Sequence, residues 1–203
     1  AGMDPNGRYI AYGMIARDYS GPNPQHGYLF DRQTGRKIKL ALGPAGPLGL
    51  AKEGVFSGDG STYAMLRERN DLGISYISIY RTRDGALLET LPQPKGTIFG
   101  SVGGLDQTGR RLALDMLDPA RATHAQAYLY DRRTTTYTMV SRNTAGRPAN
   151  GPTGPSGSQA LTPDGRTYLI DSPAGNLVAG DVPYDPDKPY DADTYDADLY
   201  IAT

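Results

Sequence analysis

Short apolar runs recur along the chain, and each one follows a turn-like stretch that contains a glycine. The turns are DPNGR (4–8), SGDGS (57–61), DQTGR (106–110) and TPDGR (162–166), and their glycines are 53, 49 and 56 residues apart. The runs that follow are RYIAYG, STYAML, RRLALD and RTYLID, with large residues at the third and fifth positions and alanine or leucine between them. Runs that are apolar on both faces are typical of strands that lie between neighbouring sheets.

A second pattern follows about twenty residues later in the first three units. Its segments are YLFDRQTGRKIKL, SIYRTRDGALLETL and YLYDRRTTTYTMV, in which Asp31, Arg81 and Asp131 stand 50 residues apart. Each segment is typical of a strand, a tight turn and a second strand, and Gly35 and Gly85 suit turn positions with positive φ. Each unit is therefore predicted to be a meander of about four strands.

A period of about 50 residues with four strands per unit is typical of propeller blades and not of helical solenoids. The sequence predicts an all-β fold, a β-propeller of four-stranded antiparallel blades. A chain of 203 residues favours a single domain. The expected blade units are 1–42, 43–93, 94–142 and 143–203, and the last is expected to be incomplete because it stops inside its third strand.

Three arrangements would account for the incomplete unit. The chain could be a segment of a longer polypeptide with more blades, the fourth blade could have three strands, or a neighbouring chain could add a strand to the unpaired edge.

The units resemble TolB-type propeller repeats, which are relatives of the WD-repeat blades. The resemblance rests on the pattern S-x-D-G-x-x-hydrophobic-A, followed by hydrophobic-Y-x-x-D-x-x-T-G. The stretch LTPDGRTYLIDSPAGNLVAGD with DADLYIAT is similar to repeats of bacterial exported proteins. The chain departs from that pattern from Pro183 onward, where a loop is longer, and in SGDG and DQTG, which lack the usual proline. The resemblance implies a propeller at an extracellular, cell-surface or periplasmic location, and it leaves the function open because propellers host many functions.

The fourth unit carries an acidic insertion. From Gly165 to Tyr200 there are 35 residues, against 21 from Gly7 to Tyr28 and 19 from Gly109 to Tyr128. The additional residues contain six aspartates: Asp185, Asp187, Asp191, Asp193, Asp196 and Asp198. Carboxylates suit Ca²⁺, although the spacing is not that of an EF-hand. The insertion is either a calcium site or a solvated acidic loop, and calorimetric titration with Ca²⁺ distinguishes the two.

Three tyrosines alternate with these aspartates, namely Tyr184, Tyr190 and Tyr195. Tyrosines in a loop offer a large apolar area with a polar tip, which suits contact with a protein or carbohydrate partner. The alternative is that they pack the loop against its own blade.

The net charge of −1 hides an asymmetry along the chain. Residues 1–150 hold 19 Lys and Arg against 13 Asp and Glu, a net charge of +6, whereas residues 151–203 hold 2 against 9, a net charge of −7. Opposite poles could attract copies of the chain into a homo-oligomer or filament, or they could be uneven surface decoration.

Composition excludes several classes of site. The absence of cysteine excludes disulfides and thiolate metal sites, and the presence of only two histidines argues against a histidine-rich metal site. The sequence has no concentration of basic residues of the kind that binds nucleic acid. It also has no apolar run of ~18 residues, the length that would suggest insertion into a membrane.

The sequence contains no recognisable catalytic constellation and requires no cofactor. We therefore expect a non-enzymatic, extracellular or cell-surface binding or scaffold propeller that self-assembles into an oligomer or filament. The alternative is a propeller domain that supports a hydrolase or lyase within a longer polypeptide.

Overall fold

The structure is a computed structural model, and it describes residues 2–15, 25–42, 50–69, 74–118, 122, 124–180 and 198–203. Within these residues every regular element is a β-strand, and no helix long and apolar enough to cross a membrane is present. The predicted all-β class is confirmed.

The strands form four antiparallel sheets. The first contains β1 (Gly2–Met3), β2 (Tyr9–Ile15), β3 (Gln25–Asp31) and β4 (Arg36–Lys39). The second contains β5 (Leu50–Phe56), β6 (Thr62–Arg69), β7 (Ile74–Arg81) and β8 (Leu87–Thr90). The third contains β9 (Ile98–Leu105), β10 (Arg111–Leu117), β11 (Gln126–Asp131) and β12 (Thr136–Met139). The described strands of the fourth are β13 (Gly154–Pro155), β14 (Tyr168–Ser172) and β15 (Asp198–Ala202).

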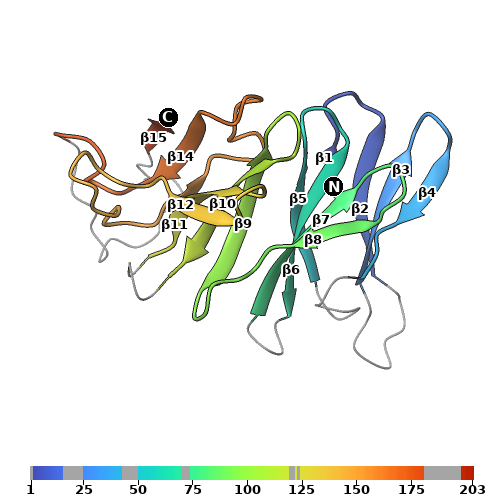
Figure 1. Cartoon of the computed structure of the whole chain (residues 1–203), viewed down its shortest axis with the longest axis horizontal. Helices are drawn as coiled ribbons and strands as arrows, with labels where there is room; N and C mark the ends of the chain where they lie inside the picture. Colours follow the sequence, from blue (N-terminus) through green and yellow to red (C-terminus); the bar gives the residue numbers. More distant parts are fainter. Residues whose placement is uncertain are drawn as a thin grey trace.

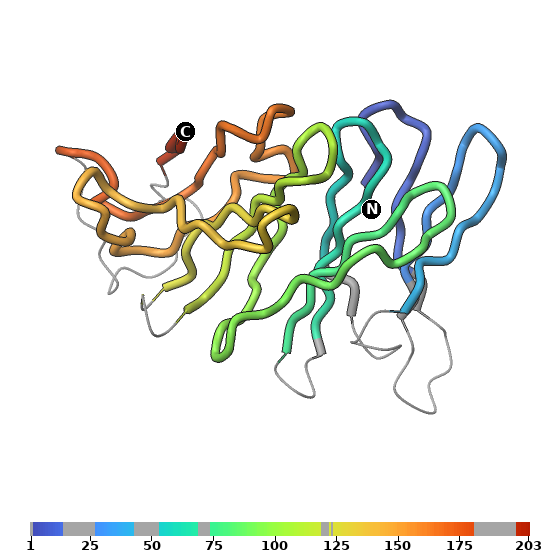
Figure 2. Tube along the Cα trace, in the orientation of Figure 1, coloured from blue at the N-terminus to red at the C-terminus, as the bar shows by residue number. Residues whose placement is uncertain are grey.

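Within each sheet the strands follow one another in chain order, so each sheet is the predicted meander. The sheets lie side by side in sequence order, with the first and fourth at opposite ends of the molecule (Figure 1). Figure 2 shows that each sheet is built from one continuous stretch of the chain. Neighbouring sheets contact each other through pairs such as β5 with β9 and β9 with β13.

The core consists of three junctions between consecutive sheets, and the same register positions form each junction. Ala11 on β2 lies opposite Leu29 on β3, and both pack with Tyr63, Met65 and Tyr80 of the second sheet. We call the face of a sheet that carries this alanine position and its cross-strand partner the next face, because it is directed toward the following sheet. The opposite face, directed toward the preceding sheet, is the previous face. A next face of small and branched residues thus packs on a previous face rich in large side chains.

The same rule holds at the other two junctions. Ala64 and Ile79 lie opposite each other on the next face of the second sheet, and they cluster with Leu112 and Tyr130 of the third. Ala113 of the third sheet clusters with Tyr168 of the fourth. Burial of apolar side chains on both faces of the inner sheets explains why the central runs of the sequence show no polar face.

The strand that follows the acidic insertion returns to the fourth sheet. β15 pairs with β14 from Tyr168 opposite Ala202 to Ser172 opposite Asp198. The expected position of the insertion, between the second and third strands of the unit, is therefore confirmed.

Candidate binding groove

The four turns that were recognised as a repeat gather at one end of the sheets, at the top of Figure 1. Main-chain hydrogen bonds connect three of them: the N–H of Asp59 donates to the carbonyl of Gln107 at 2.9 Å, and the N–H of Gln107 donates to the carbonyl of Pro163 at 2.7 Å. The side-chain amide of Asn6 donates to the carbonyl of Asp59 at 3.4 Å and brings in the first turn. The turns are thus fixed relative to one another as well as to their own strands.

Local chemistry explains the shape of each turn. The turn glycines have φ of 68°, 70°, 70° and 66°, a region in which a residue with a Cβ is strained. Aspartate carboxylates accept main-chain N–H groups within the turns, as Asp106 does from Arg110 at 2.8 Å and Asp164 does from Arg166 at 3.0 Å. Such carboxylates satisfy N–H groups that would otherwise face solvent in a tight turn.

A groove of about 560 Å³ lies beside these turns, and we call it the central groove. It is lined by residues of all four sheets or of the turns that join their first two strands. Its apolar side chains include those immediately before each turn, namely Met3, Phe56, Leu105 and Leu161. Leu169 and Ile201 of the fourth sheet extend the apolar lining, and Gln107, Ser158, Gln159, Thr162 and Thr167 supply amides and hydroxyls.

None of the described residues that line the central groove is an acid, a base or a histidine. General acid–base chemistry needs a titratable side chain within hydrogen-bond reach of the reacting atoms. The lining instead combines apolar area with a few neutral hydrogen-bonding groups, which is typical of a ligand-binding site.

The ionisable groups near the turns pair with one another outside the groove. Arg8 donates two hydrogen bonds to Asp31, at 3.0 and 2.9 Å, and the pair holds the pKa of the Asp31 carboxyl well below its usual range. Arg110 makes the equivalent contact with Asp131 and lowers the pKa of that carboxyl to about 2. These carboxylates stay charged and occupied at neutral pH, so they are structural groups and not candidate catalysts.

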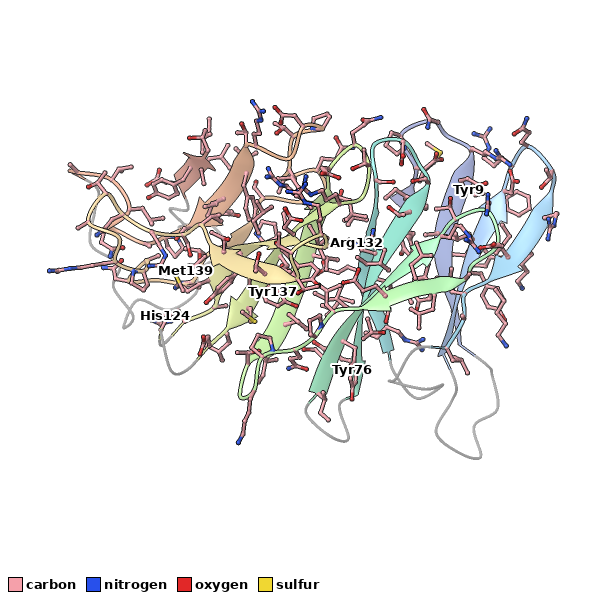
Figure 3. All side chains as sticks on the ribbon, in the orientation of Figure 1. Tyr9, Tyr76, His124, Arg132, Tyr137 and Met139 are labelled. Carbon is pink, nitrogen blue, oxygen red and sulfur yellow. The ribbon has the colours of Figure 1, made fainter. Side chains whose placement is uncertain are left out.

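Another ionic contact bridges the second and third sheets. Arg132 lies in the turn between β11 and β12, and Tyr137 lies on β12 (Figure 3). The Arg132 Nε donates to Glu89 at 2.7 Å, and the Tyr130 hydroxyl donates to the same carboxylate at 2.8 Å. The Tyr137 hydroxyl donates to the Pro92 carbonyl at 3.0 Å. These contacts hold the two sheets together on the side away from the groove-lining strands.

A smaller cavity of about 230 Å³ lies between the first and second sheets and is lined partly by Glu53 and Tyr63. Burial raises the pKa of the Tyr63 hydroxyl far above its usual value, so the hydroxyl stays protonated. A phenol that stays protonated is a poor nucleophile and a poor general base.

Most of the residues singled out in the sequence lie outside the described residues. This holds for Asp185, Asp187, Asp191, Asp193 and Asp196, and for Tyr184, Tyr190 and Tyr195. Asp198 is described, and it is an exposed residue at the start of β15. The part of the chain that the structure describes holds no group of three or more side chains that could bind a metal ion. Calcium binding and contact through the tyrosines stay predictions.

The central groove was missed at the sequence level, although the sequence carries a signal for it. An apolar residue precedes every one of the four turns, as Met3, Phe56, Leu105 and Leu161. Since first strands of propeller blades line the central channel, a repeated apolar position at their ends predicts an apolar patch there.

No protein-family model and no curated protein match the chain. Solved structures do match it. The acylaminoacyl peptidase of Pyrococcus horikoshii superposes with a TM-score of 0.58 at 11% identity, over 100% of this chain and 30% of that one. The β-propeller domain of the Trilobed protease of Pyrococcus furiosus superposes with a TM-score of 0.56 at 12% identity, over 97% of this chain and 52% of that one. A prolyl endopeptidase superposes with a TM-score of 0.55 at 13% identity, over 83% of this chain and 25% of that one.

The fold is a β-propeller. At these identities the likeness concerns the fold alone. This chain spans about half or less of the length of each of the three solved chains.

Proposed function

We propose that this propeller is a non-catalytic binding module that holds an uncharged, extended segment of a partner protein in the central groove. The observation that carries the proposal is the composition of the groove, whose lining is apolar along the ends of the first strands and also contains neutral amides and hydroxyls. An extended segment would bury apolar side chains there and use the amides of Gln107 and Gln159 for its main chain.

The TolB-like character of the repeats belongs to the same proposal. The four glycine turns, of which SGDG (57–60) fits the S-x-D-G pattern, and the strands that follow them support a TolB-type propeller of a bacterial exported protein, and hence an extracellular, cell-surface or periplasmic location. Fractionation of cells that carry the tagged, complete gene product tests the location, and its recovery with cytosolic markers alone would contradict it.

Selection from a phage library of twelve-residue peptides tests binding in the groove. We expect the selected peptides to be poor in charged residues. The variant Gln107→Glu adds a negative charge to the groove with almost no change of shape, and we expect it to weaken binding of a selected peptide at least tenfold. Gln33→Glu makes the same change in an exposed turn outside the groove and serves as the matched control.

Two outcomes would contradict the proposal. One is a peptide affinity that both variants leave unchanged, because the peptide would then bind elsewhere. The other is the absence of any selected peptide together with binding to a glycan array that Gln107→Glu abolishes, because the groove would then serve a carbohydrate.

A second candidate is a propeller domain that supports a peptidase domain in the same polypeptide. It is favoured by one specific observation: the similar solved structures described above come from peptidases by their names. The sequence of the complete open reading frame tests it, since a catalytic peptidase domain in frame with this chain would support this candidate over a stand-alone binding module.

A further inference from the structure

The three junctions in the core define what a covered sheet face looks like in this molecule. On the next faces of the first and second sheets, Leu29 and Ile79 are each 0% exposed because the following sheet covers them. On the previous faces of the second and third sheets, Tyr80 and Tyr130 are each 0% exposed for the same reason. Every junction therefore joins one next face to one previous face.

Among the residues that the structure describes, no sheet covers the junction residues on the next face of the fourth sheet. Ile201 lies opposite Leu169, just as Leu29 lies opposite Ala11, yet Ile201 is 69% exposed. Leu199 occupies the register position of Ile77, which is fully buried, and Leu199 is 60% exposed. Large apolar side chains in adjacent positions at such exposure are typical of an interaction surface.

The previous face of the first sheet is the complementary case. Phe30 lies opposite Ile10 and occupies the register position of Tyr80 and Tyr130, but it is 36% exposed. Beside it, the rings of Tyr12 and Tyr28 stack with centroids 5.7 Å apart and are only partly buried. This face has the large side chains that cover a next face elsewhere in the molecule.

The charges of the two faces are opposite. Lys37 and Lys39 lie on the previous face of the first sheet, opposite Phe30 and Tyr28. Asp171 lies on the next face of the fourth sheet, opposite Leu199, and is exposed. The same polarity runs along the whole chain, with a net charge of +6 over residues 1–150 and −7 over residues 151–203. Opposite charges at the rim of an apolar contact set its orientation and oppose the pairing of like faces.

We propose that these two faces dock onto each other between two copies of this chain, head to tail, so that the first sheet of one copy covers the fourth sheet of the other. Each new contact is a junction of the kind that already occurs three times within the chain. Two copies bring together eight sheets, which lies within the usual range of about four to eight blades for a propeller ring. A head-to-tail contact closes into a ring when the rotation between copies allows it.

Light scattering coupled to size exclusion measures the mass of the native particle. We expect the wild-type chain to have twice the 21.8 kDa mass of one copy at low salt, and a weaker association at high salt. Leu199→Asp and Phe30→Asp each place a charge in one of the two faces, and each variant alone should be monomeric. Leu88→Asp changes an exposed leucine of β8 away from both faces and should stay dimeric. Leu199 is used in place of Ile201 because Ile201 also lines the central groove.

Mixing the two monomeric variants is the decisive measurement. Leu199→Asp keeps an intact first-sheet face and Phe30→Asp keeps an intact fourth-sheet face, so the mixture should form a heterodimer through one intact junction. Leu199→Ser and Phe30→Ser, which remove apolar area without adding charge, form a second pair of variants, and circular dichroism verifies that each variant is folded.

A wild-type chain that is monomeric at every concentration and salt would overturn the proposal and leave the two faces to other proteins or to further blades. Dimers that only one of the two substitutions disrupts would also overturn it, since like faces would then be paired. The groove variant Gln107→Glu should leave the mass unchanged, so failure of this proposal and failure of the proposed peptide binding are separate results.

Discussion

Arg110 holds Asp131 with two hydrogen bonds from its guanidinium, and the pair ties the first turn of the third sheet to the end of its third strand. Arg8 and Asp31 form the same contact in the first sheet. The second sheet has Ser61 and Arg81 at these positions, and there the hydroxyl of Thr82 donates to the carbonyl of Gly60 at 2.7 Å. The blades thus fasten one turn to one strand by different chemistry.

Replacement of Asp131 by asparagine should destabilise the protein. Asp131 also accepts the N–H of Arg133 at 2.9 Å, and a neutral side-chain amide in place of the carboxylate would weaken these charge-assisted contacts. We expect the free energy of unfolding to fall by about 1.5 kcal/mol, the lower end for hydrogen bonds to charged groups. Asp84→Asn is the matched control: Asp84 also pairs with an arginine but is much more exposed, and a solvent-screened pair of this kind contributes little to stability. Urea denaturation measures both values, and equal losses would contradict a special role for Asp131.

Acid should weaken the same ion pairs in a defined pH window. The pKa of Asp131 is about 2 in the folded protein, because Arg110 donates to its carboxylate, against an ordinary value of 3.8. A carboxyl whose folded pKa is lowered contributes stability that is fully present above its unfolded pKa and is lost as the pH falls through the folded one. The free energy of unfolding should therefore drop between about pH 4 and pH 2.

The variant Asp131→Asn gives the comparison for this pH dependence. Its unfolding free energy should fall less steeply than that of the wild type over the same window, since one of the titrating groups is gone. Parallel curves for the two proteins would mean that Asp131 is not among the groups responsible.

The sequence predicted the strands well because their signals are local. Gly35 and Gly85 were expected at positive φ, and they have φ of 70° and 71°. The alternation of small and large residues around Ala64 and Ala113 correctly indicated strands covered on both faces. The same expectation was wrong for the strand around Ala11, because Ile10 and Tyr12 on its other face are only partly buried. Each of these features depends on a few neighbouring residues and on the backbone geometry they favour.

The central groove has only a non-local signal in the sequence, namely the apolar residue before each of the four turns. Met3, Phe56, Leu105 and Leu161 are about 50 residues apart in sequence, and only the docking of the four turns brings them to one groove. The pairing of Arg110 with Asp131 joins residues 21 apart in sequence, so no local pattern indicates it. Of the six aspartates predicted as a calcium site, only Asp198 lies in the described part of the chain.

The third sheet departs from the glycine rule at Thr135, and this gives a further prediction. Thr135 occupies the turn position of Gly35 and Gly85 and has φ of 54°, which is unfavourable for a β-branched residue. Thr135→Gly should raise the free energy of unfolding by about 0.5–1 kcal/mol. The substitution removes the cost of the left-handed conformation, and the greater conformational entropy of glycine in the unfolded state offsets part of that gain. Thr134→Gly makes the same change where φ is negative and should destabilise it. A lower melting temperature for Thr135→Gly would contradict the argument.

Close approach between the third and fourth sheets depends on Gly103 of β9. A Cβ added there would lie 1.8 Å from the Cβ of Pro155 and 2.4 Å from its Cγ, and neither atom can move without shifting β13. Gly103→Ala should therefore lower the free energy of unfolding by about 1–3 kcal/mol, as overpacking of a tight junction does.

Gly13→Ala is the control for this substitution, because Gly13 is also a glycine within a strand and a Cβ there would meet no atom within 4 Å. We expect that variant to be neutral or more stable by up to about 1 kcal/mol, through reduced entropy of the unfolded chain. If the two substitutions had equal effects on thermal unfolding, the packing of β9 against β13 would be looser than the structure shows.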